Sequence, residues 1–334
     1  MGNDASTAKR PHDGEKASSS LNDAQGVDQP HEDEGTFRAF DERSSTSSTI
    51  SHRAGFTTMT SSASKVLKAR TPGTRHDESM TDGSPLPNLI VIGAMKAGTT
   101  ALHQYLGRHP DIQMSDPKEL CFFYNDEPTT AVPKGDHELR ALHGSAGNLH
   151  RGISWYTRHF DPHARARGES SPGYTSPSFP EVASRMASVI PNASLVFLVR
   201  DPVSRAVSQY RHHVRDGTEQ RSLIEALSDP TSHYVLRSKY AARLSPFLRH
   251  FTHDQIVIAE QEDLAGDPIT VLSELLFFVG VRASDAAALV PRRLRPSPRP
   301  PLPIQVIDPI GELVAEDAAE FRDMTGRRFA TWSI

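Results

Sequence analysis

One loop of the chain combines small residues with a single lysine, in the manner of a phosphate-binding site. Residues 93–100 read GAMKAGTT and have the two-glycine spacing of the GxxxxGK[ST] phosphate loop. Small residues let backbone N–H groups turn inward around a phosphate, and a helix that starts behind them adds a favourable dipole. The residues predicted to contact the phosphate, through N–H groups and hydroxyls, are Ala97, Gly98, Thr99 and Thr100.

The lysine of this loop departs from the ATPase pattern. It stands at Lys96, whereas ATPases carry lysine directly after the second glycine, where this chain has Thr99. No aspartate that could hold Mg²⁺ ends a neighbouring strand pattern, so the loop points away from ATP hydrolysis. A compact ammonium in this place suits an oxygen on which negative charge develops as a bond to phosphate breaks. Only four lysines follow residue 85, which sets Lys96 apart from generic surface charge.

A second anion-binding candidate lies about 100 residues further on. Arg200 follows the apolar run 195–199, LVFLV, and ligand contacts collect at the carboxyl ends of parallel strands. A guanidinium group can bind phosphate through two parallel hydrogen bonds. We therefore expect Arg200 to face the same ligand as the loop.

The elements that must position these residues alternate along the chain. Wholly apolar runs at 89–92, 195–199 and 256–259 predict strands buried on both faces, and a weaker strand is predicted to run into Glu169. Helical patterns are expected at about 101–109, 202–215, 235–250, 268–279 and 310–324. This order predicts an α/β fold with a central parallel sheet flanked by helices.

Composition divides the chain into two parts. Residues 1–85 are rich in Ser, Thr, Asp, Glu, His and Gly without apolar periodicity, so we expect a disordered N-terminal arm. Residues 86–334 are expected to form one domain. The net charge of −4 gives no electrostatic case for nucleic acid. One cysteine excludes an intramolecular disulfide, and no apolar run is long enough to span a membrane, so a cytoplasmic location is expected.

Two segments resemble the cofactor motifs of sulfotransferases that use 3′-phosphoadenosine 5′-phosphosulfate (PAPS). Residues 89–106, LIVIGAMKAGTTALHQYL, resemble the loop that binds the 5′-phosphosulfate. Residues 195–210, LVFLVRDPVSRAVSQY, are similar to the segment that binds the 3′-phosphate. The pair at 155–156 (WY), residues 169–174 (ESSPGY) and the closing M-T-G…W of 324–332 resemble the heparan-sulfate-type and related bacterial carbohydrate enzymes. The resemblance covers residues 88–334.

This resemblance implies a P-loop-type three-layer fold and the transfer of a sulfuryl group. PAPS would be the co-substrate and adenosine 3′,5′-bisphosphate the product, with no metal. Lys96 would stabilise the leaving phosphate, and Glu119 would be the general base for in-line attack by the acceptor. Arg200 and Ser208 would bind the 3′-phosphate.

The resemblance also implies an acceptor site. Glu169 and Tyr174 match a segment that lines the acceptor cleft, in which the family's lysine is Ser170 here. The expected acceptor is a hydroxyl or amine, on a carbohydrate or a glycosylated small molecule. Which acceptor it is, whether O- or N-sulfation occurs, and the oligomeric state stay open.

Two other functions are compatible with a nucleotide-binding fold of this kind. A P-loop kinase or NTPase would need lysine at position 99 and a carboxylate for magnesium. A nucleotide-binding scaffold without catalysis would keep the fold but not the chemistry. The presence of Lys96, Glu119, Arg200 and Ser208 favours an enzyme.

Overall fold

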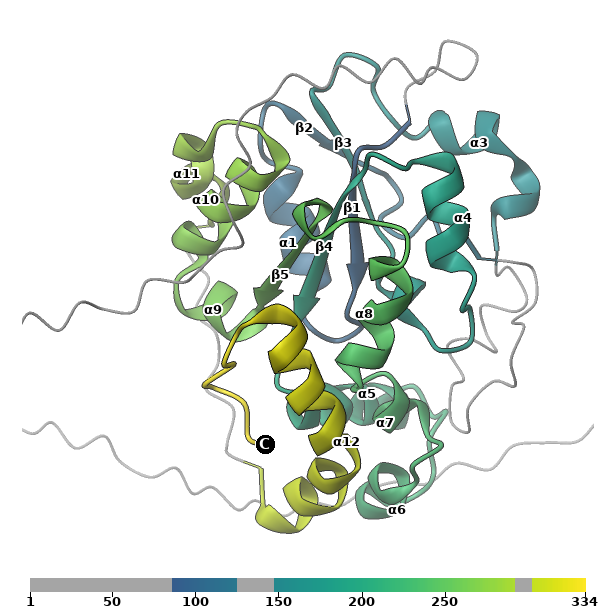
Figure 1. The fold of residues 1–334 in the computed structure, drawn as a ribbon, viewed down its shortest axis with the longest axis vertical. Coiled ribbons are helices and arrows are strands. Elements are labelled where there is room, and N and C mark those ends of the chain that lie inside the picture. The colour runs from purple at the N-terminus through teal and green to yellow at the C-terminus, as the bar shows by residue number, and fades with distance from the viewer. Residues whose placement is uncertain (1–85, 125–146, 292–301) are drawn as a thin grey trace, which may run out of the picture. The chain divides into compact units, whose positions relative to one another are not determined.

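A five-stranded parallel sheet, in the order β2-β3-β1-β4-β5, forms the centre of the molecule (Figure 1). The computed structural model describes residues 86–124, 147–291 and 302–334. The expected disordered arm at 1–85 lies outside the described residues. The strands are β1 (Leu89–Gly93), β2 (Ile112–Met114), β3 (Ala166–Ser170), β4 (Ser194–Val199) and β5 (Ile256–Glu260).

Helices cover both faces of the sheet (Figure 1). On one side lie α1 (Thr99–Leu106) and α10 (Pro268–Val279), the latter with α9 (Gln261–Gly266) and α11 (Ala286–Leu289). On the other side lie α4 (Val182–Val189) and α8 (Tyr240–Leu248), with α12 (Ile304–Thr325) packed against α8. The predicted three-layer fold with a central parallel sheet is therefore confirmed.

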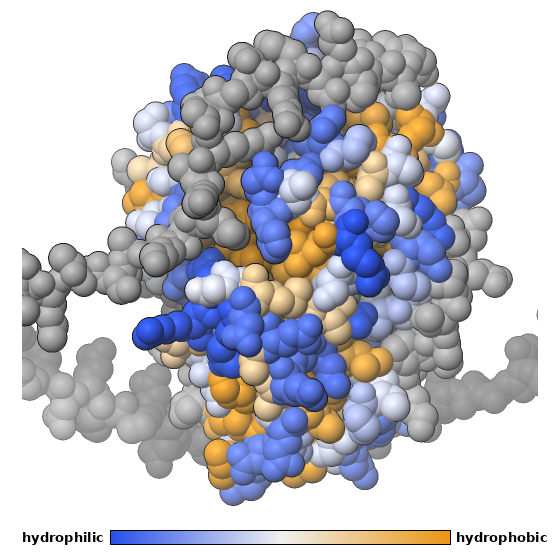
Figure 2. Space-filling model, in the orientation of Figure 1, coloured by the Kyte–Doolittle hydropathy of each residue, from blue (hydrophilic) through white to orange (hydrophobic). Residues whose placement is uncertain are grey.

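A further group of helices adjoins the carboxyl end of the sheet. It contains α5 (Pro202–Arg215), α6 (Leu223–Ser228) and α7 (His233–Leu236), which contact one another and α12. Further elements are α3 (Ile153–Thr157) and four short 3₁₀ helices: η1 (Leu149–Arg151), η2 (Pro172–Thr175), η3 (His253–Gln255) and η4 (Ala283–Asp285). Figure 2 shows apolar surface where α6 and the start of α12 lie, and exposed apolar residues of these helices are Ile224 and Ile304.

The central strands are buried along their whole length, as their apolar sequences predict. Every residue of β1 and β4 is buried, since helices cover the sheet on both faces. The weaker strand predicted before Glu169 is β3. The helix predicted at 235–250 is in fact two helices, α7 and α8, because Ser238 between them accepts a hydrogen bond from Arg205 and donates one to the carbonyl of Pro202.

Gly93 ends β1 where two other segments approach the backbone closely. A Cβ atom at this position would lie 2.6 Å from Thr175 Oγ1 and 2.9 Å from Phe197 Cε2. Both neighbours are buried and cannot move away freely. Glycine at 93 is therefore required by packing as well as by the loop that follows.

We predict that Gly93→Ala destabilises the fold by about 1–3 kcal/mol, the usual cost of overpacking a buried site. Thermal unfolding measures this as a lower midpoint. Gly266→Ala is the matched control, because a Cβ at Gly266 has no neighbour within 4 Å. Equal midpoints for the two variants would contradict this account.

Candidate active site

The predicted phosphate loop connects β1 to α1 through two residues in left-handed conformation. Lys96 has φ 67° and Gly98 has φ 95°, of which only the glycine adopts this region without strain. The amide of Ala94 donates to the carbonyl of Leu198 at 2.6 Å, and the amide of Ala97 donates to the carbonyl of Ala94 at 3.1 Å. The loop is thus tied to the end of β4 before it turns into α1.

The helix that follows the loop begins without a capping side chain. No described side chain caps α1, and its first turn holds no acidic residue. In contrast, Asp201 caps α5 and Asp267 caps α10. The first N–H groups of a helix have no partner within the helix, and the positive end of its dipole favours an anion. The start of α1, at Thr99 and Thr100, is therefore suited to a phosphate group.

Arg200, predicted to face the same ligand as the loop, lies against the loop. It follows β4 and is buried, and its Nη1 donates to the carbonyl of Lys96 at 3.4 Å. Tyr240 holds its backbone by donating to the Arg200 carbonyl at 2.8 Å. Two predicted residues that are 104 positions apart in sequence are thereby neighbours in space. Ser208 lies two turns into α5 and is half-buried.

Two residues that contact the loop were missed by the sequence analysis. Gln209 on α5 and Arg237 after α7 both donate to the sulfur of Met95, at 3.2 Å and 2.9 Å. Arg237 also donates to Ser176 Oγ at 3.5 Å. Gln209 stands beside the predicted Ser208, but Arg237 belongs to no recognisable motif and no sequence signal marked it.

Glu119 follows β2 in a segment that is bonded to the end of β3. The amide of Ser115 donates to the carbonyl of Gly168 at 2.7 Å, and that of Ser170 donates to the carbonyl of Lys118 at 3.4 Å. The side chain of Glu119 is 45% exposed and forms an ion pair with Lys118. The carboxylate therefore lies at the surface.

A histidine that the sequence analysis did not single out lies beside this segment. His103 on α1 has its Nδ1 2.9 Å from the hydroxyl of Ser170. Burial, with a further contribution from the charge of Lys118, lowers the pKa of His103. Ser170, the position at which the resembling family carries lysine, donates its amide to the backbone carbonyl of Lys118.

Glu169 and Tyr174, predicted to line the acceptor cleft, are instead almost wholly buried, at 0% and 1% exposure. Glu169 Oε1 accepts hydrogen bonds from Tyr174 at 2.6 Å and from Tyr156 at 2.8 Å. Burial raises the pKa of Glu169 to about 7, although both hydrogen bonds act in the opposite direction. A cavity of about 170 Å³ lies beyond Tyr174, with Arg243 from α8 in its wall.

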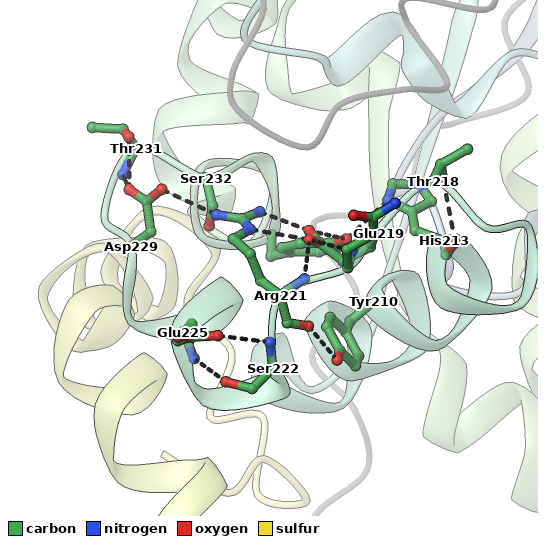
Figure 3. Close-up of polar contacts among 12 residues, drawn as sticks. Tyr210, His213, Thr218, Glu219, Arg221, Ser222, Glu225, Asp229, Thr231 and Ser232 are labelled. Atoms are coloured by element: carbon green, nitrogen blue, oxygen red, sulfur yellow. Dashed lines mark hydrogen bonds and ion pairs between the residues drawn. The ribbon is translucent and has the colours of Figure 1, made fainter.

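A second buried glutamate, Glu219, has its pKa shifted in the opposite direction. Its contacts with Arg221 are drawn in Figure 3. Glu219 accepts two hydrogen bonds from the guanidinium of Arg221, at 2.7 Å and 3.0 Å, and one from Tyr234 at 3.2 Å. Burial would raise its pKa, but the hydrogen bonds and charge of Arg221 outweigh burial and lower the pKa to about 2. Glu219 therefore has a partner of opposite charge, while the donors to Glu169 are two neutral hydroxyls.

The described residues contain neither a metal-binding cluster nor a membrane-spanning helix. No group of three or more His, Cys, Asp or Glu side chains in this part of the chain could hold a metal ion. Within the same residues, no helix is long and apolar enough to cross a membrane.

Comparison with known proteins identifies one family. Residues 87–285 match the profile of the "Sulfotransferase family". A sulfotransferase from Alicyclobacillus acidocaldarius, solved as a crystal structure, has a TM-score of 0.61 and 29% identity. That comparison covers 75% of this chain and 100% of the bacterial one.

Curated relatives are longer proteins. Over 213 residues the chain is 30% identical to bifunctional heparan sulfate N-deacetylase/N-sulfotransferase 3 of Homo sapiens. The matched region covers 59% of this chain and 22% of the relative. Over 133 residues it is 33% identical to membrane-associated sulfotransferase kil1 of Dictyostelium discoideum. This match covers 39% of the chain and 24% of the relative. The chain therefore matches less than a quarter of either relative's length.

One expectation from the sequence is wrong. A cytoplasmic location was expected from the lack of an apolar span, but the relatives include a protein named as membrane-associated. The lack of such a span does not establish the compartment of a protein.

The raised pKa of Glu169 predicts how stability depends on pH. Its carboxyl titrates at about 7 in the folded state against 4.5 ordinarily, so its stabilising contribution is complete below pH 4.5 and is lost as pH rises through 7. Wild type should lose stability relative to Glu169→Gln between about pH 4.5 and 7, by up to about 1.4 kcal/mol per unit of pKa difference. Measured from pH 5.5 upward, the loss should continue to about pH 7 and level off by about pH 8.

Chemical denaturation at several pH values measures this difference. Glu219→Gln is the control, because Glu219, with its pKa of about 2, is ionised in both states over this range. Its effect on stability should not change with pH. Parallel curves for wild type and Glu169→Gln would contradict the raised pKa.

Proposed function

Because this chain belongs to the sulfotransferase family, we propose that it transfers a sulfuryl group from PAPS to a hydroxyl or amine of an acceptor. The observation that carries the proposal is the contact between Arg200 and the carbonyl of Lys96. It brings into contact the two segments that resemble the family's 5′- and 3′-phosphate sites, which supports the proposal that both bind one nucleotide.

The donor half of the proposed site is built on the ends of β1 and β4. The residues proposed for the 5′-phosphate are Ala97, Gly98, Thr99 and Thr100. Support comes from the uncapped start of α1. Arg200 and Ser208 are proposed to bind the 3′-phosphate, as their counterparts do in the resembling segment. Lys96 is proposed to stabilise the charge that develops on the leaving phosphate.

The reaction proposed is a single in-line displacement. A lone pair of the acceptor oxygen or nitrogen forms a bond to sulfur, and the bond between sulfur and the bridging phosphate oxygen breaks. Adenosine 3′,5′-bisphosphate leaves with that electron pair, and Glu119 takes the proton of the acceptor. The exposure of Glu119 supports this role, because a base must reach a substrate that arrives from solvent.

The acceptor is proposed to be a carbohydrate or a glycosylated small molecule. The human relative is named for N-sulfation of heparan sulfate, which is a carbohydrate. The buried positions of Glu169 and Tyr174 make direct contact between an acceptor and these two side chains unnecessary to the proposal.

The NTPase alternative finds no support at the strand ends. Asp201, which follows β4, caps α5 and accepts two hydrogen bonds from Ser333, at 2.7 Å and 2.8 Å. Glu260, at the end of β5, binds Arg327 at 2.9 Å. These carboxylates already have protein partners, which argues against a role in holding magnesium.

We predict that adenosine 3′,5′-bisphosphate raises the thermal unfolding midpoint without magnesium. A ligand at 100 times its dissociation constant stabilises the folded state by about 2.7 kcal/mol. ATP, with or without magnesium, should have a much smaller effect. Stabilisation by Mg·ATP alone would favour an NTPase, and a scaffold without a working pocket would respond to neither nucleotide.

We further predict that Lys96→Ala and Glu119→Gln each lower turnover by about 10²–10³, in the range for loss of charge stabilisation or of a general base. Both should still be stabilised by the bisphosphate. Turnover is followed as sulfate transfer from labelled PAPS to N-desulfated heparan sulfate. Glu181→Gln is the control, since Glu181, the residue before α4, is a similarly exposed glutamate in an ion pair. Near-wild-type turnover in either variant would remove that residue from its proposed role.

A further inference from the structure

The segment that carries Glu119 is fixed to the end of β3 by hydrogen bonds to its backbone. We call residues 118–123 the Glu119 segment. The amide of Cys121 donates to Ser171 Oγ at 3.1 Å, and the amide of Phe122 donates to Tyr174 Oη at 3.0 Å. Both acceptors are side chains of residues that follow β3. The position of Glu119 therefore depends in part on side chains, in addition to the backbone hydrogen bond from Ser170 to the carbonyl of Lys118.

Tyr174 links the backbone of this segment to Glu169. A tyrosine hydroxyl has one proton to donate and lone pairs to accept. The proton goes to Glu169 Oε1 at 2.6 Å, so the oxygen is left to accept from the Phe122 amide. The carboxylate thus decides which way the hydroxyl of Tyr174 points.

A second tyrosine connects Glu169 to the side chain of Phe122. Tyr156 donates to Glu169 Oε1 at 2.8 Å. Its ring stacks on the ring of Phe122, with centroids 4.1 Å apart and planes 8° from parallel. Both the backbone and the ring of Phe122 are therefore held by tyrosines that bind one carboxylate oxygen.

We infer that Glu169 is a positioning residue, which orients Tyr174 and Tyr156 and through them sets the place of Glu119. The inference rests on the proposed function for its account of Glu119 as the base. Glu169 itself is fully buried, so it acts on the reaction only through these neighbours. The resemblance implied that Glu169 lines the acceptor cleft. The inference assigns it instead a buried position, from which it holds the residues that contact the Glu119 segment.

The arrangement around Glu169 offers a conservative variant. Both tyrosines donate to Oε1, and Oε2 accepts no hydrogen bond from any described residue. In Glu169→Gln the amide oxygen can accept both hydrogen bonds. The amide nitrogen replaces Oε2, so no hydrogen bond is lost there. Glu169→Ala and Tyr174→Phe, in contrast, break the link to Phe122.

The reactivity of the Cys121 thiol measures whether the Glu119 segment is in place, independently of catalysis. It is the one cysteine of the chain, and it lies between Glu119 and Phe122 with 7% exposure. Burial raises the pKa of its thiol to about 12, so it should react slowly with a disulfide reagent while the segment is in place. Release of the segment exposes the thiol.

The test compares the rate at which 5,5′-dithiobis(2-nitrobenzoate) modifies Cys121 in four variants. Loss of one hydrogen bond of about 1.5 kcal/mol corresponds to roughly tenfold more opening, so Glu169→Ala and Tyr174→Phe should react about ten times faster than wild type. Glu169→Gln should react at the wild-type rate. Tyr234→Phe, which removes a buried tyrosine hydroxyl from the Glu219 cluster, is the matched control and should not change the rate.

Turnover supplies the second readout. With PAPS and N-desulfated heparan sulfate, kcat should fall about tenfold or more in Glu169→Ala and Tyr174→Phe and return in Glu169→Gln, while bisphosphate binding stays unchanged. Wild-type thiol reactivity in both Tyr174→Phe and Glu169→Ala would overturn the inference. Faster reaction with unchanged kcat would also overturn it, since Glu119 would not need to be held. Faster reaction in a protein that neither binds the bisphosphate nor turns over PAPS would instead count against the proposed function.

Discussion

Strands β1 and β4 lie side by side, with Val91 opposite Val196 and Gly93 opposite Phe197. Because the strands are parallel and both wholly buried, their chains emerge at the same edge of the sheet, and the polar residues that follow them must meet there. The amide of Ala94 then binds the carbonyl of Leu198, and Arg200 reaches the carbonyl of Lys96. The donor half of the proposed site is thus fixed by backbone pairing, which tolerates many side chains.

The acceptor half of the proposed site, which contains the Glu119 segment, depends more on side-chain contacts. The Glu119 segment pairs with β3 only in part. Its further contacts include those with Ser171 and with Tyr174, which in turn binds the carboxylate of Glu169. Asn148 and Arg185 also donate to carbonyls of this segment. A buried carboxylate bound only by neutral hydroxyls is costly to ionise, as the contrast with the arginine-bound Glu219 illustrates. The half of the molecule that must meet the acceptor therefore depends on a few specific side chains, whereas the half that meets the cofactor depends on the sheet.

The parts of the fold that follow from local pattern were predictable from the sequence. The apolar runs of β1, β4 and β5 and the helices α5 and α10 were predicted within a residue or so. The three-residue strand β2 was missed because Ile-Gln-Met is too short to show a period. The break between α7 and α8 depends on Ser238 bonding to Arg205 and Pro202, which are distant in sequence. In the same way, no local signal could show that Arg237 reaches the loop or that Glu169 is buried between two tyrosines.

The sulfur of Met95 is shared by two donors, Gln209 from α5 and Arg237 from the end of α7. Substitutions at these three positions are therefore expected to be coupled in evolution. A substitution that removes the thioether takes a hydrogen-bond acceptor from both donors at once, and burial of Gln209 and Arg237 limits their access to water as a substitute. Among relatives, changes at position 95 should therefore be accompanied by changes at 209 and 237, even though 142 residues separate the first from the last.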